Sequence, residues 1–343
     1  PNFIGYLDTL VNELESQGVA APVNIMGSNG GAMTIERARD FVVNTFLSGP
    51  VGGVNGAVRV SELAGQNNVI TFDMGGTSTD VALVSNLSPR ISHANQIDAY
   101  PLQVPQLDMH TIGAGGGSIV WVRPDGTLEV GPQSAGALPG PACYQRGGKD
   151  PTISDANLVM GRLPTQRKLS GGLVLSYELA EKAFKDVAEK LGVIDADPVR
   201  LAESVLRIAV AKMAGAVREV SVHRGVDPRD FTMVGFGGAG PMHVFLVAEE
   251  LGINNVIIPR FPGHLSALGQ LLADQRRDHA DPFKGRLREV DMGDLRASFN
   301  AMRETGAAEL EADGFRSDRQ KFEYVCDMRY VGQSFTLRIP WQP

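Results

Sequence analysis

Hydrophobic residues recur every three to four positions in several segments of the chain, which is the spacing of one face of an α-helix. The first of these segments starts at Asn2, a candidate N-cap, and ends before Gly18. The same spacing predicts helices over about 176–191 and 198–223, and a more polar helix over about 292–312. We expect each of them to bury its apolar face on a core.

Short apolar runs alternate with these helices and are followed by glycine-rich turns. They predict strands at 23–26, 69–73, 81–84, 231–234 and 256–258, and further helices from about residue 34 and over 51–63, 241–251 and 265–273. The glycine turn between 69–73 and 81–84 predicts a hairpin. The Gly- and Pro-rich stretch 89–170 predicts strands and long loops. Strands that alternate with helices favour an α/β fold.

Small residues dominate the predicted helix 51–63. Its residues Gly52, Gly53 and Gly56 would let another backbone approach closely, although each glycine costs about 1 kcal/mol of helix propensity. We therefore expect this helix to lie deep between two lobes.

Composition and charge exclude several classes of protein. Of 343 residues, 43% are hydrophobic and 21% charged, which is typical of a globular chain. The net charge of −7 argues against nucleic acid as a partner. The uncharged stretch 231–248 contains four glycines and a proline, so we expect no membrane partner. Cys143 and Cys326 form no disulfide pattern, which fits a cytoplasmic protein. Because the chain opens with Pro1 rather than Met, we expect a piece of something longer.

The strongest chemical motif is the segment 73–80, which lies between two predicted strands. Gly75 and Gly76 permit the close backbone approach that a phosphate chain needs, and Thr77 and Ser78 add hydroxyl groups. Asp73, at a strand end, can hold hydrated Mg²⁺. The alternative is a plain β-hairpin whose turn is stabilised by Asx-type hydrogen bonds.

A second glycine turn follows the strand 231–234 and precedes a helix. Gly237, Gly238 and Ala239 would let an adenine or ribose pack on backbone and place phosphates near a helix N-terminus. Together the two turns predict a nucleotide site. A glycine-rich α/β domain without a nucleotide is the alternative.

A third cluster is a candidate for a second divalent metal. Asp108 and His110 lie on the same side of an extended segment, and they can share a metal or act on a substrate. Cys143 and Asp155 would complete a zinc-type site. A histidine bonded to a carboxylate in a loop core is the alternative.

Other polar positions have weaker signals. His243 is interpreted either as a neutral ring near the site or as a capping residue. A structural role is expected for the rest: an N-terminal or surface position for His264, a solvated face for Arg276, Arg277 and Asp278, an interface or core for Arg329 and Tyr330, and burial for Cys326.

Six sequence blocks together resemble the hydantoinase A / 5-oxoprolinase family (N-methylhydantoinase A-like). They are DMGGTSTD (73–80), TIGAGGGSI (111–119), SAGALPGPACY (134–144), GFGGAGPMH (235–243), PGHLSALG (262–269) and DMRYVGQSF (327–335). The resemblance implies a ribonuclease H-like, actin-like ATPase fold of the Hsp70 and sugar kinase superfamily, with ATP held between two lobes. It makes 48–63 and 265–273 the connecting helices, 73–80 the second phosphate loop and 235–240 the adenosine motif.

The resemblance also implies domain boundaries and a missing part. The family pattern has an earlier phosphate loop that this sequence lacks, so we expect a fragment without the N-terminal lobe that does not turn over ATP by itself. Residues 1–47 would end the first lobe or form an interlobe segment, 48–277 would be the ATPase domain, and 278–343 would begin a C-terminal domain.

The activity implied by the family is ATP-dependent opening of a small cyclic amide such as hydantoin or 5-oxoproline. ATP and Mg²⁺ are the implied cofactors, with a hydantoinase B-type partner subunit or domain and an oligomeric assembly. Asp73 would orient metal or water, Asp80 would support the loop or the metal, and Asp108 and His110 are further catalytic candidates. The alternatives are a subunit of an ATP-dependent ketone carboxylase, for acetone or acetophenone, and a non-catalytic nucleotide-binding module.

Overall fold

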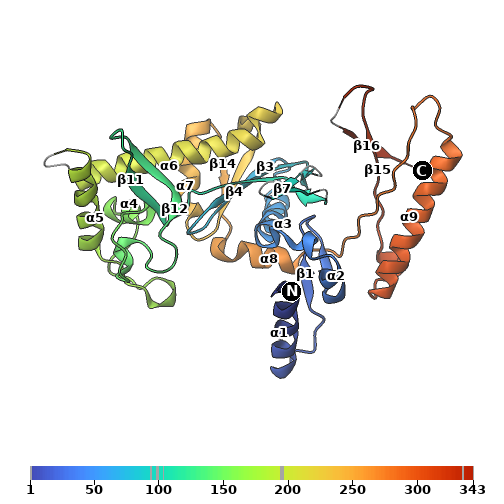
Figure 1. Ribbon diagram of the computed structural model, residues 1–343, viewed down its shortest axis with the longest axis horizontal. Helices are drawn as coiled ribbons and strands as arrows, with labels where there is room; N and C mark the ends of the chain where they lie inside the picture. The colour runs from blue at the N-terminus through green and yellow to red at the C-terminus, as the bar shows by residue number, and fades with distance from the viewer. Residues whose placement is uncertain are drawn as a thin grey trace. The chain divides into compact units, whose positions relative to one another are not determined.

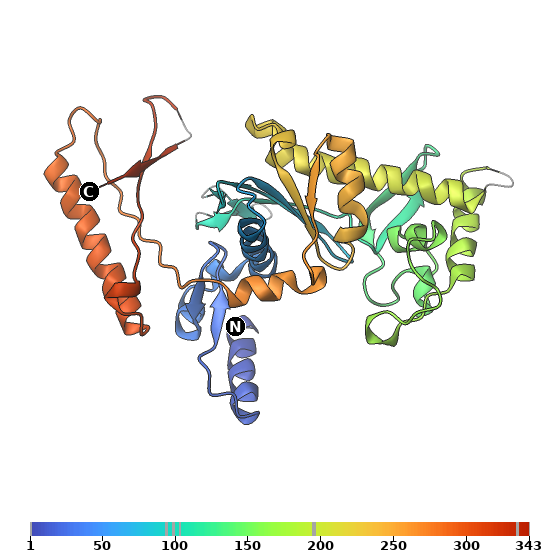
Figure 2. The same ribbon diagram turned by 180° about the vertical axis from the view of Figure 1, so that it is seen from behind.

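The computed structural model describes residues 2–92, 95–97, 100–102, 104–193, 197–333 and 336–342 (Figures 1 and 2). Their contacts divide the chain into two compact units. The larger unit comprises 26–30 and 42–273, and the smaller unit comprises the chain up to 25, 31–41 and the chain from 274 onward. The family-based boundaries at 47/48 and 277/278 stay a prediction.

A mixed sheet forms the centre of the larger unit. Its strands are β3 (Val69–Met74), β4 (Thr79–Ser85), β10 (Met109–Ile112), β13 (Thr232–Phe236) and β14 (Asn255–Ile257), in the order β10-β4-β3-β13-β14, and β5 (Ser88–Pro89) pairs with β4. The β10-β4-β3 part is antiparallel, whereas β3, β13 and β14 are parallel. The sheet thus joins a hairpin to a parallel α/β unit, as the sequence predicts.

Alternation along the strands gives the sheet two apolar faces. Ile70, Phe72 and Met74 belong to a core that includes α6 (Pro198–Val220) and α7 (Gly240–Leu251). Val69, Val234 and Phe236 belong to a second core with α3 (Ser48–Leu63) and α8 (Leu265–Leu271). The sheet is therefore covered by helices on both faces.

Helices α3 and α8 touch through backbone atoms and lie side by side in both views (Figures 1 and 2). A Cβ atom at Gly269 would lie 1.8 Å from the carbonyl oxygen of Gly52 and 2.4 Å from the nitrogen of Gly56. One at Gly56 would lie 2.6 Å from the carbonyl oxygen of Leu265. Only glycine fits at these positions, which confirms the close approach predicted for the small-residue helix.

After β10, the chain forms a β-hairpin and two helices. The hairpin pairs β11 (Ser118–Val122) with β12 (Leu128–Ser134), and the helices are α4 (Ile153–Val159) and α5 (Tyr177–Lys190). Helix α4 starts with a capping box in which Thr152 and Asp155 exchange side-chain and backbone hydrogen bonds. Short pairs β6 (Ile91–Ser92) with β9 (Gln106–Leu107), and β7 (Asn95–Ile97) with β8 (Tyr100–Leu102), lie between β5 and β10 in the chain.

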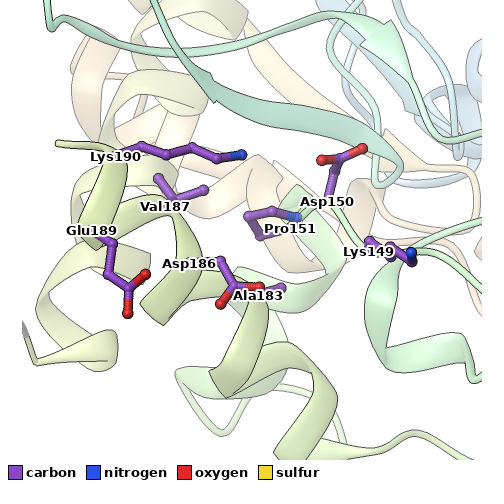
Figure 3. Close-up of a pocket in the computed structure, with 8 residues that line it drawn as sticks. All are labelled: Lys149, Asp150, Pro151, Ala183, Asp186, Val187, Glu189 and Lys190. Atoms are coloured by element: carbon purple, nitrogen blue, oxygen red, sulfur yellow. The ribbon is translucent and has the colours of Figure 1, made fainter.

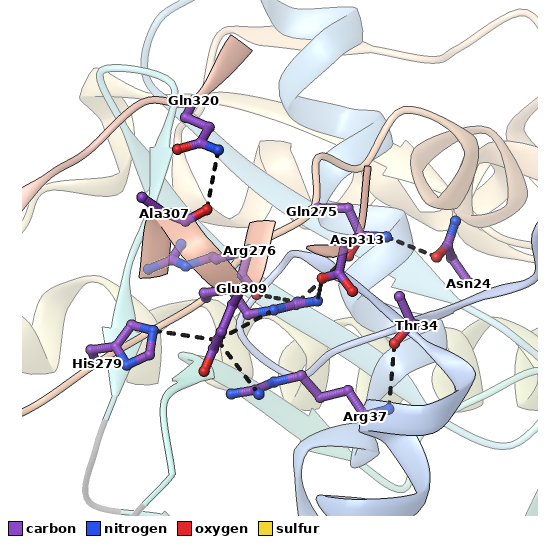
Figure 4. A network of polar contacts seen from close by, with 11 residues as sticks. Asn24, Thr34, Arg37, Gln275, Arg276, His279, Ala307, Glu309, Asp313 and Gln320 are labelled. Carbon is purple, nitrogen blue, oxygen red and sulfur yellow. Dashed lines mark hydrogen bonds and ion pairs between the residues drawn. The ribbon is translucent and has the colours of Figure 1, made fainter. Parts of the chain in front are cut away.

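The smaller unit combines sequence-distant segments: α1 (Asn2–Ser16), the paired β1 (Asn24–Met26) and β2 (Ala32–Thr34), α2 (Ile35–Asp40), α9 (Met292–Ala312), and the hairpin of β15 (Tyr324–Met328) and β16 (Leu337–Trp341). Glu309 on α9 contacts Arg37, Arg277 and His279 (Figure 4). The Arg277 side chain, only 3% exposed, also pairs with Asp313. The solvated face predicted for Arg277 is therefore wrong, because Arg277 is buried against Glu309 on α9 and against Asp313, the C-cap residue of that helix.

Most predicted helices and strands are confirmed within one to four residues. The strand, turn and helix expected at 23–40 instead contains a second strand, because the glycines at 27–31 reverse the chain and let β2 pair with β1. Helix α4 was not predicted. Cys326 is half-buried, so the buried position expected for it is wrong. Tyr330 is 69% exposed, which excludes the core position, and the interface position stays a prediction. Ser334 and Phe335, in the last family block, lie outside the described residues.

Candidate nucleotide-binding site

The two glycine turns meet because β3 and β13 are parallel neighbours, with Asp73 opposite Phe236. The N–H of Ala239 donates to the carbonyl of Met74 (2.8 Å). Gly237 has a φ of 84°, and a Cβ atom there would lie 2.3 Å from Oδ1 of Asp73. The structure therefore joins the segments 73–78 and 237–239 into one surface, although they are distant in the sequence.

The turn of the β3–β4 hairpin presents open backbone. It closes with a hydrogen bond from the Gly75 N–H to the Ser78 carbonyl (3.1 Å). A Cβ atom at Gly75 or Gly76 would meet no atom within 4 Å, and Gly76 and Thr77 are exposed. The fold itself does not require glycine at these two positions, so the space beside them is available to a ligand.

The segment 115–117 supports this turn from behind. Gly116 N–H donates to the Gly75 carbonyl (3.0 Å), and Gly117 N–H donates to the Gly76 carbonyl (2.6 Å). A Cβ atom at Gly115 would lie 2.6 Å from the backbone nitrogen of Thr77. The family block 111–119 thus holds the predicted phosphate loop in place.

Two carboxylates lie opposite each other across the hairpin. Asp73 and Asp80 are register partners, so they project from the same sheet face, on which α3 and α8 pack. Burial and the Asp80 charge raise the pKa of Asp73 to about 6, while a hydrogen bond from Ser266 on α8 opposes the rise. Burial also raises the pKa of Asp80, against hydrogen bonds from Thr111 (2.5 Å) and Ser78.

This donor set fits a divalent cation. Paired carboxylates that repel each other are stabilised in their ionised form by a positive charge, and Mg²⁺ prefers oxygen ligands. Sequence reasoning missed Ser266, although it lies within the block 262–269. A hydroxyl group on the predicted second connecting helix was the sequence feature that could have indicated a contact with the site.

The residues of the proposed second metal site have other partners. Asp108 accepts hydrogen bonds from both terminal nitrogens of Arg224 and lies 3.6 Å from Nε of Arg90. The Cys143 N–H donates to Asp155 (2.7 Å), and burial raises the pKa of the Cys143 thiol. His110 lies on β10 opposite Val81.

Across the part of the chain that the structure describes, no three His, Cys, Asp or Glu side chains gather as metal ligands. The second metal site with Asp108, His110 and Cys143 is therefore unsupported there. Sequence spacing alone did not show that Asp108 is paired with Arg224, which lies 116 residues further along the chain.

A surface cavity of about 580 Å³ lies between the segment 149–151 and α5 (Figure 3). Charged side chains surround it, and its lining contains none of the predicted site residues: Lys149, Asp150, Pro151, Ala183, Asp186, Val187, Glu189 and Lys190. We assign it no role in the nucleotide site.

Among the described helices, none is both long and apolar enough to cross a bilayer.

The sheet, its covering helices and the joined glycine turns are those of an actin-like ATPase lobe. A family model described as Hydantoinase/oxoprolinase matches residues 1–279, and the chain belongs to this family. The resemblance identified from the sequence is thereby confirmed.

Similar proteins agree with this assignment. An uncharacterized protein of Methanocaldococcus jannaschii is 41% identical, covering 99% of this chain and 51% of its own. Caprolactamase subunit alpha of Pseudomonas jessenii is 39% identical, and the match covers 96% of this chain and 47% of that subunit. The crystal structure of the ATP-dependent caprolactamase from Pseudomonas jessenii matches with a TM-score of 0.84 and 36% identity, and the match covers 100% of this chain and 50% of the caprolactamase chain.

Nucleotide-free acetone carboxylase is also similar in structure, with a TM-score of 0.78, 28% identity, and 97% of this chain and 48% of the other covered. The chain spans about half the length of each of these relatives.

Proposed function

We propose that this chain is the nucleotide-binding part of an ATP-dependent cyclic amidase, a hydrolase that opens hydantoin, 5-oxoproline or a related small lactam. The family description and the name of the similar caprolactamase support this substrate class. One observation carries the nucleotide role: the Ala239 N–H bonds to the Met74 carbonyl, and Gly237 packs on Asp73, so the open hairpin turn and the exposed Gly238 share one surface.

The proposed reaction answers a chemical problem. An unstrained amide carbonyl is a poor electrophile, and transfer of the γ-phosphoryl group of ATP to its oxygen, which releases ADP, activates the carbon for attack by water. The C–N bond then breaks to give an amine and an acyl phosphate, and a second water hydrolyses the acyl phosphate to the carboxylate and inorganic phosphate. Phosphoryl transfer requires mainly positioning and charge neutralisation. Open backbone N–H groups beside carboxylates are suited to that task.

Each part of the site has a role in this proposal. Gly76, Thr77 and Ser78 bind phosphate through N–H and hydroxyl groups, and Gly75, whose N–H is bonded to the Ser78 carbonyl, leaves room for the phosphate to approach. The adenosine contacts the second turn, at Gly237, Gly238 and Ala239.

The carboxylates serve the metal. Bound Mg²⁺ would supply positive charge to the phosphates; Asp73 would hold it or orient water, and Asp80 would support Asp73 and the loop. We propose no catalytic role for Asp108, whose oxygens contact Arg224. His110 stays a prediction.

A ketone carboxylase subunit is the second candidate, because acetone carboxylase has nearly the same fold over this chain. Such an enzyme would use the same ATP equipment with a ketone and bicarbonate. A non-catalytic nucleotide-binding module would bind ATP without substrate-stimulated turnover.

We further propose that the chain acts within an oligomeric assembly that contains a hydantoinase B-type partner subunit or domain, and that it is cytoplasmic. Relatives named as subunits support the assembly. Both cysteines are free, which fits a reducing compartment.

The test uses a glycine position at which the fold has room for a side chain, but at which a side chain would obstruct a bound phosphate. In the complete enzyme containing this chain, we expect Gly76→Ala to leave the melting temperature within about 2 °C and to weaken ATP binding at least about tenfold. Gly215→Ala on α6, where a Cβ atom also meets nothing within 4 Å, is the matched control. Unchanged ATP affinity in the Gly76 variant would refute the site.

Substrate class is decided separately by ADP release with caprolactam, 5-oxoproline, hydantoin, or acetone plus bicarbonate. Release only with the ketone and bicarbonate would replace the amidase by the carboxylase. ATP binding without stimulated release by any of them would favour the non-catalytic module.

A further inference from the structure

His243 is a buried imidazole that the proposed function leaves without a role. It lies in the first turn of α7 and is 0% exposed. Burial lowers its pKa, so the ring is neutral near pH 7. No ring atom reaches solvent, and a direct catalytic role for it is therefore excluded.

Both ring nitrogens have hydrogen-bond partners. Nδ1 lies 3.0 Å from the carbonyl oxygen of Ala239, which can only accept, so this nitrogen carries the proton. Nε2 of the neutral ring must then accept, and Nδ2 of Asn157, 3.1 Å away, is its donor. Asn157 is 1% exposed, and its Nδ2 also donates to the Ile153 carbonyl (2.9 Å).

The two ends of this connection reach the phosphate hairpin by different routes. On one side, the Ala239 N–H donates to the Met74 carbonyl (2.8 Å). On the other side, the Ser154 N–H of α4 donates to the Gly116 carbonyl (2.7 Å), and the Gly116 N–H donates to the Gly75 carbonyl (3.0 Å). His243 and Asn157 thus close a ring of contacts around the site through α4, the segment 115–117, the hairpin and the second glycine turn.

We propose that His243 is a positioning residue of the nucleotide site, which with Asn157 holds the turn 237–239 in register with the phosphate hairpin 73–78. This inference rests on the proposed nucleotide site. An ordinary capping residue would satisfy only the Ala239 carbonyl. The side-chain bond to Asn157 joins that turn to a different helix, and a shift of either helix would separate adenosine contacts from phosphate contacts.

The test compares two substitutions and their combination in the complete enzyme. His243→Asn keeps a side-chain amide near the Nδ1 position but removes the Nε2 acceptor, and Asn157→Leu removes the donor at similar volume. We expect each single substitution to raise both the Kd and the KM for ATP about tenfold and to change kcat by less than about threefold. The Kd of the double variant should not exceed that of the single variant with the higher Kd. Non-additivity is the signature of a shared contact.

Ser221→Ala is the matched control, because the buried Ser221 hydroxyl bonds only to the Val217 carbonyl of its own helix end (2.6 Å). It loses one buried hydrogen bond and should keep the wild-type Kd. If His243→Asn does not fold, His243→Gln and Asn157→Leu carry the comparison, with folding checked by thermal unfolding.

Two outcomes separate this inference from the proposed function. Wild-type protein that binds ATP, with variants that bind equally well or lose only kcat, overturns the positioning role alone. Wild-type protein that binds no nucleotide in calorimetry overturns both.

Discussion

Asp73 and Asp80 face each other across the β3–β4 hairpin as register partners, and the negative charge of Asp80 helps to raise the pKa of Asp73 to about 6. The folded protein therefore binds the Asp73 proton more tightly than the unfolded chain, whose aspartate titrates near 4. Between these values stability falls as pH rises, because the folded state holds more protons than the unfolded state. The site is electrostatically unfavourable for the fold until a cation or a proton compensates it.

Asp73→Asn should accordingly stabilise the chain at neutral pH while abolishing ATP cleavage. The wild-type penalty is fully present above pH 6 and disappears as pH falls below about 4. We expect the variant to have the higher melting temperature at pH 8, and the difference to shrink at pH 4. Differential scanning calorimetry at both pH values measures this, and a lower melting temperature of the variant at pH 8 would contradict it.

Asp227→Asn provides an opposite control for that experiment. The Arg229 side chain lowers the pKa of Asp227 to about 2, so its ionised form favours the folded state. This variant should lose, not gain, stability at pH 8, and lose less as pH falls toward 2.

Ser266→Ala should change the pH dependence of turnover. The Ser266 hydroxyl favours the ionised form of Asp73, so its removal raises the pKa of Asp73 further above its ordinary range. If Asp73 acts as the ion, the acid limb of the profile of kcat/KM against pH moves to higher pH. Ser61→Ala, which removes a buried hydroxyl bonded only within α3, should leave the profile in place.

Gly269→Ala should destabilise the larger unit. The added Cβ would collide with backbone atoms of Gly52 and Gly56, which cannot rotate away, and we expect a loss of about 3 kcal/mol in the free energy of unfolding. Gly49 lies on α3, like Gly52 and Gly56, but it is exposed, and a Cβ atom there would meet nothing within 4 Å. Gly49→Ala should therefore be neutral or stabilising by about 1 kcal/mol. Urea titration followed by Trp121 fluorescence compares them in a Trp341→Phe background.

Arg277→Met should destabilise the smaller unit. It leaves Asp313 without its buried partner and removes one of the cations beside Glu309, at a cost of about 3 kcal/mol. Trp341, which stacks on Phe299 of α9, reports on this unit in a Trp121→Phe background. Arg316→Met breaks the exposed pair with Asp318 and should change stability by less than about 1 kcal/mol, so equal losses in both variants would refute the prediction.

Local chemistry made part of this structure predictable. The hairpin 69–84 follows from β-branched runs around a glycine turn, and α9 was predicted with its observed bounds from periodicity. The pairing of strands that are distant in the sequence could not be predicted from any local pattern. The two glycine turns together predicted a nucleotide site, but no local pattern indicated that β3 and β13, about 160 residues apart, are the neighbouring strands that join them.

The missed features share the same origin. Asp108 was expected beside a metal, but Arg224 reaches it from the short 3₁₀ helix Val222–Arg224 that follows α6. Ser266 bonds to Asp73 from α8, and Asn157 bonds to His243 from α4; neither lies in one of the two glycine turns. Ser266 lay on the predicted second connecting helix, and α4 also had a local signal, the Thr152 and Asp155 capping box, in a region that otherwise predicted loops.

The glycines between α3 and α8 differ from those of the β3–β4 turn in the reason that a side chain would be harmful there. Replacing Gly52, Gly56 or Gly269 would be punished in any screen for correctly folded protein, because α3 and α8 share no room for a methyl group. Gly75 and Gly76 would pass such a screen and be recovered as glycine only when growth depends on turnover. A mutational library sorted first for folding and then for activity would therefore separate the residues that build the lobe from those that serve its ligand.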